Sequence, residues 1–267
     1  MPEPLGREIC AGIGWMAHWL VGRDRRLARR NLALVNQDWP KDKVNREAKV
    51  VFQEIGRNAY DFLRYPRLSP ERRKSLVELE GREHLEAARR QGKGAILATA
   101  HWGSWEVLAA HLSSEGYSLK SLARPLREAR LERMLSQHRS EMGSTTISSE
   151  GSLLPAVRHL KQNGMLGVLV DQRLKSGGVF VDFFGQRTRV ADGPVRLAQR
   201  TEACIVPLGI SRLKDHRHRI VVRPPIQVDA STPTVSITQH LMHELESLIL
   251  TAPEQWIWIH PRWEEAS

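Results

Sequence analysis

The chain is poor in cysteine, and this bounds both its compartment and its chemistry. It has only two cysteines, Cys10 and Cys204, in 267 residues, far too few for the disulfide framework of a secreted domain. Both lie among apolar residues, so we expect a reducing, cytosol-facing location. The chain also lacks C-x-x-C and H-E-x-x-H pairs, a G-x-x-x-x-G-K-[ST] loop and a G-x-S-x-G elbow around Ser104. These absences argue against metal, P-loop and elbow-type hydrolase sites, and no metal ion or cofactor is expected.

Long hydrophobic runs are also absent. Residues 9–22 form an apolar run of 14 residues that includes His18, against the roughly 20 that span a bilayer, and the segment before it lacks the features of a signal peptide. The basic segment RDRRLARR, residues 23–30, follows at once. An apolar run with tryptophans beside a dense basic segment is typical of a helix lying at an anionic interface. Two alternatives stay open: a helix packed on the domain with a solvated basic end, and an N-terminal anchor that lies outside this sequence.

Acidic residues are also fewer than basic residues. Lys and Arg number 40 against 30 Asp and Glu, which gives a formal net charge of +10. Such a charge indicates a negative partner, which is nucleic acid, anionic lipid headgroups or an acidic protein. The chain shows no helix-turn-helix, zinc-finger or aromatic RNA-binding signature,. A nucleic-acid-binding protein is therefore the weaker interpretation, and no nucleic acid is expected as a partner.

The pattern of the chain changes near residue 76. Residues 1–75 are typical of a helical N-terminal extension, with a membrane-interfacial role as one interpretation, and residues 76–267 of an α/β domain. Alternating strands and helices predict a layered α/β fold with a largely parallel or mixed sheet flanked by helices. Strands are expected at residues 94–100, 118–124, 145–149, 165–171, 204–212 and 219–228, and the main helices at residues 24–35, 41–68, 104–116, 127–143, 153–164 and 238–253.

The segment AHWGSWE, residues 100–106, places a histidine and a glutamate five residues apart where a strand passes into a helix. Ligands gather at the carboxyl ends of strands in open α/β sheets, and a neutral imidazole there can take a proton from a hydroxyl. Residues five apart lie roughly 140° apart on an ideal helix. We therefore expect His101 to precede the helix on a turn that Gly103 permits, with Glu106 reaching back from the first helical turn. In the alternative interpretation, Glu106 only complements the helix dipole.

The remaining candidates differ in how specific they are. Composition alone predicts about one histidine followed five places later by an acid,, and the chain has a second such pair, His260 and Glu265, which is expected to be dispensable for chemistry. Asp171 ends an apolar run, so it also falls at the carboxyl end of an expected strand, and the convergence of these ends favours a site there. Arg139 ends a basic helix, where it either binds a phosphate or carboxylate or is a solvated charge.

Many further segments match one family in order along the chain. They are RRNLALV, GRNAYDFLR, LEGREHLEAARRQGKGAILATAHWGSWEVLA, HRSEMG, GVLVDQ, GVFVDFFG, GPVRLAQRTEACIVPLGISR and PEQWIWIHPRW. Together they resemble the bacterial lipid A late acyltransferases (the lauroyl and myristoyl acyltransferases) and the related mycobacterial phosphatidylinositol mannoside acyltransferases. The resemblance implies a glycerolipid acyltransferase-like fold. It places His101 and Glu106 on the family's His-x4-Asp/Glu motif, Arg139 on its arginine before a glycine, and Asp171 and Gln172 on its Asp-Gln motif.

The resemblance also implies a reaction, namely O-acyl transfer in the biosynthesis of lipid A and lipopolysaccharide. The donor would be acyl carrier protein or acyl-CoA, and the acceptor a hydroxyl of a lipid A precursor or a related glycolipid or phospholipid. His101 would be the general base and Glu106 would orient its imidazole. Arg139, Asp171 and Gln172 would bind substrate or support the base. The alternative is a thioesterase or lipid hydrolase that uses water at the same site.

Attachment to the membrane is the point at which the sequence departs from that family. Its members usually begin with a membrane-spanning helix, whereas residues 9–22 are too short to serve as one,. We therefore expect peripheral or weak attachment to an anionic membrane surface, at the cytoplasmic face of the bacterial inner membrane. This departure concerns the attachment and leaves the expected chemistry unchanged.

Overall fold

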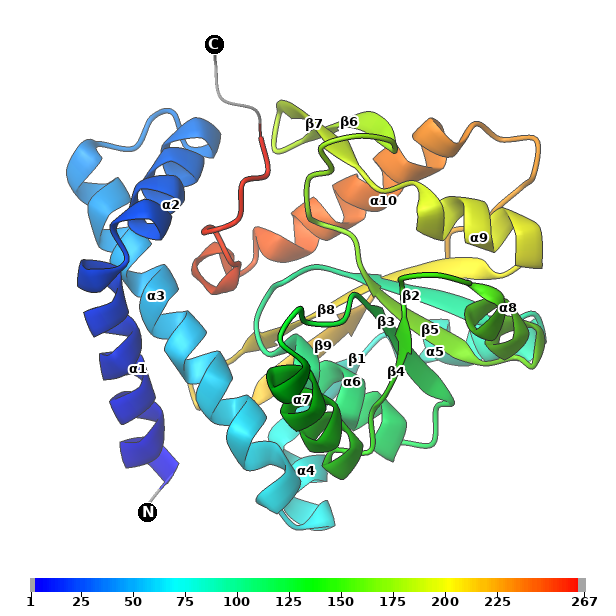
Figure 1. Cartoon of the computed structure of the whole chain (residues 1–267), viewed down its shortest axis with the longest axis horizontal. Coiled ribbons are helices and arrows are strands. Elements are labelled where there is room, and N and C mark those ends of the chain that lie inside the picture. The colour runs from blue at the N-terminus through cyan, green and yellow to red at the C-terminus, as the bar shows by residue number, and fades with distance from the viewer. Residues whose placement is uncertain (1–2, 264–267) are drawn as a thin grey trace.

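The computed structural model describes residues 3–263, in which a group of helices precedes a sheet that is covered on both faces (Figure 1). The leading elements are α1 (Glu3–Leu20), α2 (Gly22–Val35), α3 (Lys41–Arg64), the 3-10 turn η1 (Tyr65–Arg67) and α4 (Pro70–Leu76). The helix expected over residues 41–68 ends at Arg64, because Pro66 has no amide hydrogen to continue the helical hydrogen bonds, and the chain passes into η1,. Among the described residues, none of the helices is both long and apolar enough to span a bilayer.

Helices α1 and α3 approach each other so closely that each has a glycine, Gly14 or Gly56, where the other helix crosses it. A Cβ atom on Gly14 of α1 would lie 2.0 Å from the carbonyl oxygen of Phe52. A Cβ atom on Gly56 of α3 would lie 2.1 Å from the carbonyl oxygen of Cys10. A side chain at either glycine would therefore force the two backbones apart. The contact buries one face of α1 against α3 and leaves the opposite, largely apolar face exposed.

In the described part of the chain, seven strands form the main sheet in the order β1-β9-β8-β2-β5-β3-β4. The strands are β1 (Val77–Glu80), β2 (Ala95–Thr99), β3 (Leu119–Ala123), β4 (Thr145–Ser148), β5 (Met165–Leu169), β8 (Cys204–Arg212) and β9 (His218–Val222). Neighbouring strands are parallel except β8 and β9, which form an antiparallel hairpin. The predicted α/β fold with a largely parallel or mixed sheet is confirmed. The strand expected to reach residue 228 ends at Val222, because Pro224 and Pro225 have no amide hydrogen to donate.

The central strands are buried on both faces, which explains their uninterrupted apolar sequences. Side chains of β2 alternate between two cores: Ile96 lies in one and Leu97 in the other,. The first core is formed with α8 (Leu154–Lys161), α9 (Gly193–Thr201) and α10 (Thr234–Ile249), and the second with α5 (Arg82–Arg90) and α6 (Trp105–Ser114). The hairpin of β6 (Val179–Phe183) and β7 (Gln186–Val190) packs on α10, and α7 (Ala129–Glu141) lies in front of α6 in Figure 1.

The register of two neighbouring strands brings distant residues to one edge of the sheet. Strands β2 and β5 are parallel, and Thr99 at the end of β2 is the registered partner of Leu169 at the end of β5. His101 and Asp171 each lie two residues beyond these partners. Both side chains therefore leave the sheet at the same carboxyl edge, which is where ligands bind in open α/β sheets.

Candidate functional site

His101 and Asp171 form a hydrogen-bonded pair at this edge. Nδ1 of His101 lies 2.7 Å from Oδ1 of Asp171, and the backbone N–H of His101 donates to Oδ2 at 3.1 Å. An ionised carboxylate only accepts hydrogen bonds, so the contact places the ring proton on Nδ1 and the lone pair on Nε2. Nε2 is therefore the atom of His101 that can accept a proton from a substrate.

Asp171 is fully buried, yet hydrogen-bond donors surround it. Trp256 donates its indole N–H to Oδ2 at 2.8 Å, and Arg262 donates to Oδ2 at 2.7 Å and to the backbone oxygen at 3.1 Å. Burial by itself would raise the pKa of Asp171, but its electrostatic and hydrogen-bonding interactions with His101 and Arg262 hold that pKa well below its usual range,. Asp171 is therefore a carboxylate, and it can stabilise an imidazolium at His101.

The turn that carries His101 out of the sheet depends on Gly103. Its φ is +57°, and a Cβ atom there would lie 2.0 Å from the carbonyl oxygen of Ile210 on β8, so only glycine fits. The chain after the short turn η2 (Pro253–Gln255) holds this loop in place. The N–H of Gly103 donates to the carbonyl of Gln255 at 3.1 Å, and the N–H of Ile257 donates to the carbonyl of His101 at 3.0 Å. The loop that carries His101 is thus fixed from the sheet and from the C-terminal segment.

Glu106 pairs with Arg139 and not with His101. Its two carboxylate oxygens accept from Nε and Nη2 of Arg139 at 3.0 and 2.6 Å, a bidentate ion pair between α6 and α7,. Burial lowers the pKa of Arg139, but the hydrogen bonds and charge of Glu106 outweigh burial and raise it. The expectation that Glu106 orients the imidazole is therefore corrected. Helix α6 begins at Trp105, so Glu106 lies in its first turn and faces α7, while Asp171 occupies the position beside the ring.

Two further polar side chains lie near the imidazole of His101. The amide nitrogen of Gln172 is 3.5 Å from Nε2 of His101 and 3.4 Å from Nε2 of His260. The two imidazole rings are 5.3 Å apart, edge to face. Burial, with the nearby positive charge of Arg262, lowers the pKa of His260 to about 4, so this ring is neutral near pH 7. Because His260 lies beside His101, its position no longer supports the expectation that it is dispensable for chemistry. Its sequence partner Glu265 lies outside the described residues.

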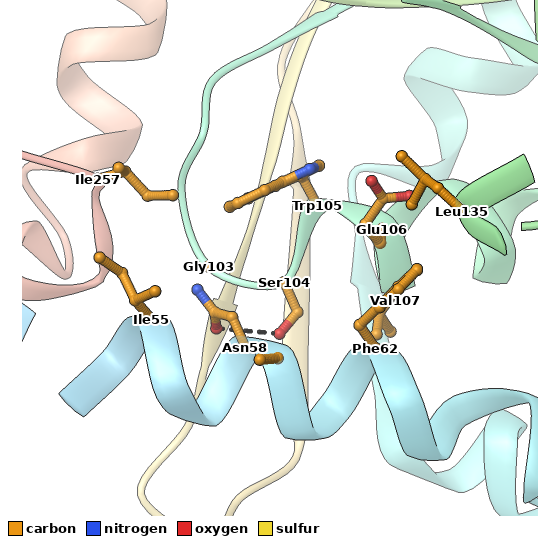
Figure 2. A pocket seen from close by; sticks show the side chains of 11 residues that line it. Ile55, Asn58, Phe62, Gly103, Ser104, Trp105, Glu106, Val107, Leu135 and Ile257 are labelled. Atoms are coloured by element: carbon orange, nitrogen blue, oxygen red, sulfur yellow. Dashed lines mark hydrogen bonds between the residues drawn. The ribbon is translucent and has the colours of Figure 1, made fainter. Parts of the chain in front are cut away.

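An apolar cavity of about 240 Å³ adjoins these residues (Figure 2). Trp105 forms part of its wall, and the ring of Trp105 lies 5.2 Å from the ring of His101. The Ser104 hydroxyl donates to Oδ1 of Asn58 at 3.1 Å, while the buried amide nitrogen of Asn58 has no hydrogen-bond partner among the described residues. The cavity is lined by Ile55, Asn58, Ala59, Phe62, Gly103, Ser104, Trp105, Glu106, Val107, Leu135 and Ile257. An alkyl chain would thus meet mostly hydrocarbon.

Sequence reasoning missed Trp256 and Arg262 and expected His260 to be dispensable; all three belong to the C-terminal segment. Trp256 and Arg262 bind Asp171, and His260 lies beside His101. This segment is neither helix nor strand after η2, so periodicity gives no signal there. The usable signal was its unusual wealth of tryptophan around a histidine and an arginine in QWIWIHPRW. Within residues 3–263, no three His, Cys, Asp or Glu side chains are grouped to hold a metal ion.

Comparison with known proteins gives matches along nearly the whole chain. The model of a family described as bacterial lipid A biosynthesis acyltransferase matches residues 1–265. A phosphatidylinositol mannoside acyltransferase of Mycolicibacterium smegmatis is 27% identical over 98% of this chain and 86% of its own length. A lipid A biosynthesis acyltransferase of Haemophilus influenzae is 22% identical over 97% of this chain and 81% of its own. A lipid A biosynthesis myristoyltransferase of Escherichia coli is 25% identical over 97% of this chain and 80% of its own.

Proposed function

The chain belongs to the bacterial lipid A biosynthesis acyltransferase family, and on this premise we propose that it moves a fatty acyl group from an acyl thioester to a hydroxyl of a lipid A precursor or a related glycolipid or phospholipid. Family and relatives make the protein an acyltransferase. The donor, the acceptor and the roles of the residues are our proposal. The observation that carries it is the His101–Asp171 pair beside an apolar cavity, because O-acyl transfer needs a base for the hydroxyl and a place for the chain.

In the proposed mechanism, the acceptor hydroxyl donates its proton to Nε2 of His101 while its oxygen attacks the thioester carbonyl carbon. The carbonyl π electrons move to oxygen and give a tetrahedral oxyanion. Collapse of this intermediate re-forms the carbonyl and breaks the C–S bond, and His101 returns the proton to the leaving thiolate. The products are an ester and a free thiol. Asp171 keeps the ring in the productive tautomer and stabilises the imidazolium while it exists.

Stabilisation of the oxyanion is assigned to backbone amides at the start of α6. The first four N–H groups of a helix have no acceptor within the helix, and the loop that carries His101 directly precedes α6,. Arg139 is the competing candidate, but Glu106 already engages two of its guanidinium nitrogens. We therefore assign the Glu106–Arg139 pair to holding α7 against α6 at the edge of the cavity.

The acyl chain is placed in the cavity of Figure 2, with the thioester carbonyl beyond Trp105 and near His101. Helix α3 forms the far wall through Ile55 and Phe62, and Leu135 of α7 closes one side. Filling this space removes the chain from water, and each buried methylene contributes about 0.8 kcal/mol. The depth of the cavity then sets which chain lengths are accepted.

Attachment to the membrane is assigned to α1 and α2. The exposed face of α1 is apolar, and opposite to the face that packs on α3. Its large exposed side chains are Leu5, Ile9, Ile13, Trp15, Met16, Trp19 and Leu20. Arginines of α2 follow directly, so apolar and basic groups are combined as in peripheral helices on anionic lipid. We propose that the protein lies on the cytoplasmic face of the inner membrane, where acyl carrier protein or acyl-CoA delivers the chain.

The test uses purified protein, acyl carrier protein or CoA loaded with chains of different lengths, and a bacterial lipid extract, with products identified by mass. We expect an acylated glycolipid whose formation needs both donor and extract. His101→Ala should remain folded and lose transfer by at least ~10²-fold, the lower range for loss of a general base. Full transfer by the folded variant overturns the mechanism. Release of free fatty acid that is indifferent to the extract identifies a thioesterase or hydrolase instead.

A further inference from the structure

Ser104 precedes helix α6 but makes no capping bond to it. Its hydroxyl turns to α3, where it lies 3.1 Å from Oδ1 of Asn58 and 3.0 Å from Oδ2 of Asp61. The first bond within the helix runs from the N–H of Leu108 to the carbonyl of Ser104 at 3.1 Å. The N–H groups of residues 105–107 therefore have no acceptor within the helix, and these three residues all line the cavity of Figure 2.

A further donor on the same wall belongs to Asn58 of α3, which is 8% exposed. Its Oδ1 accepts from Ser104 and from Nη2 of Arg212, the latter at 2.6 Å. Because a guanidinium can only donate, the oxygen must face Arg212, and the amide nitrogen is directed the other way. This nitrogen is buried and has no hydrogen-bond partner among the described residues. Figure 2 shows it turned toward the side of the cavity where Gly103 and Ile257 lie.

The orientation of Asn58 is fixed by its neighbour Arg212. Arg212 is itself buried, and it binds Asp61 at 2.6 Å and also Glu54. Asn58 therefore cannot rotate toward another acceptor without breaking a buried network. An unsatisfied buried donor costs about 1–3 kcal/mol, which indicates that a ligand atom completes this site. A donor held in place before the ligand binds is also what electrostatic stabilisation of a transition state requires.

The polar side chains and helix-end amides that remain on this wall, among the described residues, are donors. Oδ1 of Asn58 already accepts two bonds, and both oxygens of Glu106 are engaged by Arg139. A water molecule or a hydroxyl bound here would leave its own hydrogen without an acceptor. A carbonyl oxygen has two lone pairs and no hydrogen. The wall therefore suits a carbonyl oxygen, and suits it better as negative charge develops on that oxygen.

This wall lies at the end of the cavity that adjoins the loop of His101. Ile257 lines the cavity, and its N–H donates to the carbonyl of His101 at 3.0 Å. Phe62 and Leu135 lie at the opposite end in Figure 2. An acyl chain whose tail lies between Phe62 and Leu135 consequently has its carbonyl group on the side of Asn58.

We propose that Asn58 is a catalytic residue, whose amide N–H binds the carbonyl oxygen of the donor thioester together with the first amides of α6. The inference rests on the proposed acyl transfer and adds to it a side chain from the leading helices. When the acceptor oxygen bonds to the carbonyl carbon, the π electrons move to the carbonyl oxygen, and these hydrogen bonds stabilise the resulting charge. The hydrogen of Asn58 stays on its nitrogen. The bond is stronger in the transition state than in the ground state, so it acts on kcat.

Two substitutions separate this catalytic role from a structural one. Asn58→Asp keeps the oxygen that binds Ser104 and Arg212 and replaces the N–H group by a second oxygen, whereas Asn58→Leu removes both. Transfer is measured with the donor that the wild type uses and the glycolipid fraction of a bacterial lipid extract. We expect kcat to fall about 10²-fold in both variants, in Asn58→Asp at least as far as in Asn58→Leu, with the donor KM within about 3-fold of wild type. Asn45→Asp, at an exposed position of the same helix, is the matched control and should keep the wild-type kcat.

Infrared spectroscopy of the bound donor tests the contact without turnover. The donor carries an isotope label at its carbonyl carbon and is bound to His101→Ala, which does not consume it. Adding Asn58→Leu or Asn58→Asp to this variant should move the carbonyl stretching band to higher wavenumber, because one hydrogen bond to the oxygen is lost. Adding Asn45→Asp should leave the band in place. If Asn58→Leu fails to fold, Asn58→Asp decides, since it keeps the bonds to Ser104 and Arg212.

The outcomes that overturn the proposal are distinct from failure of the acyl transfer itself. An unchanged carbonyl band overturns it, as does wild-type kcat in folded Asn58→Asp, which would leave Asn58 a structural residue. A loss of activity confined to donors with a hydroxyl on the acyl chain also overturns it, because Asn58 would then bind the chain and not the thioester. Failure of the acyl transfer shows as absent ester formation by the wild type or as full transfer by His101→Ala.

Discussion

Removing the charge of Asp171 should lower turnover by about three orders of magnitude. At the observed 2.7 Å, an imidazolium and a carboxylate attract each other by about 6 kcal/mol at an effective dielectric constant of 20,. The neutral imidazole of the resting enzyme gains only about 1 kcal/mol from its hydrogen bond. The difference of about 5 kcal/mol acts only when His101 has taken the proton, and Arg262 offsets part of it. About 4 kcal/mol remains, so Asp171→Asn should lower kcat by about 10³-fold.

A double-mutant cycle separates this effect from any direct contact of Asp171 with substrate. The rates of acyl transfer are compared for the wild type, His101→Ala, Asp171→Asn and the double variant, with product ester measured by mass. If Asp171 acts through His101, the double variant should be no slower than His101→Ala alone. If the rate losses of the two single variants instead multiply in the double variant, the assignment is refuted and Asp171 acts directly on the acceptor.

Folding must be controlled, because Asp171→Asn leaves the buried guanidinium of Arg262 without its partner. Breaking a buried ion pair destabilises by about 3–5 kcal/mol, so rates are compared below the melting transition of every variant. Asp61→Asn is the matched control, since Asp61 is a buried carboxylate paired with the buried Arg212 at 2.6 Å. It should lose stability but keep more turnover than Asp171→Asn, because Asp61 lies at the cavity wall whereas Asp171 is bonded to His101. Equal losses of turnover in both variants would show that the effect of Asp171 is one of folding.

Three further predictions follow from other parts of the molecule. Ala59→Phe narrows the cavity, so with a mixture of donors the product masses should shift to shorter acyl chains. An unchanged distribution of product masses would show that the acyl chain does not bind in this cavity. Trp19→Glu places a charge on the exposed face of α1 and should reduce sedimentation with anionic vesicles while sparing activity on detergent-dissolved acceptor. Burial lowers the pKa of His218 to about 4. Below about pH 6.5, the usual pKa of histidine, the unfolded chain therefore binds a proton at this residue that the folded chain does not bind. The free energy of unfolding should fall as the pH drops from 7 to 5. Urea unfolding should show that His218→Asn removes about 2 kcal/mol of this loss, whereas the exposed control His216→Asn leaves it unchanged.

The sequence was most informative where physical constraints are local. Apolar runs buried on both faces identify the strands, and adjacent parallel strands deliver their ends to one edge, so the convergence of His101 and Asp171 was predictable in kind. The partner of His101 was assigned wrongly, because Glu106 is close in sequence. In space, the first turn of α6 directs Glu106 to Arg139 on another helix. Closeness along the chain says little about contacts at a strand-to-helix corner, where the direction of the chain changes.

The other gap concerns contacts between segments far apart in the sequence. Trp256 and Arg262 reach Asp171 from an irregular segment, where no periodicity marks the residues that face inward. Asn31 looks like an ordinary polar residue within a basic helix, and only the folded chain shows its amide buried on two carbonyl groups. Such residues satisfy buried polar atoms, and their partners are fixed by tertiary structure alone.

These contacts make the leading helices part of the site, in addition to their proposed role in attachment. Helix α3 lines the cavity through Ile55 and Phe62, and α2 holds the loop of His260 through Asn31. Arg212 at the end of β8 binds Asp61 of α3 at 2.6 Å, so the cavity wall is tied to the sheet by a buried ion pair. Residues on both sides of the expected boundary at 75 therefore build one site. If α1 and α2 lie on a membrane as proposed, the same contacts hold the His101–Asp171 pair at a fixed height above the lipid surface.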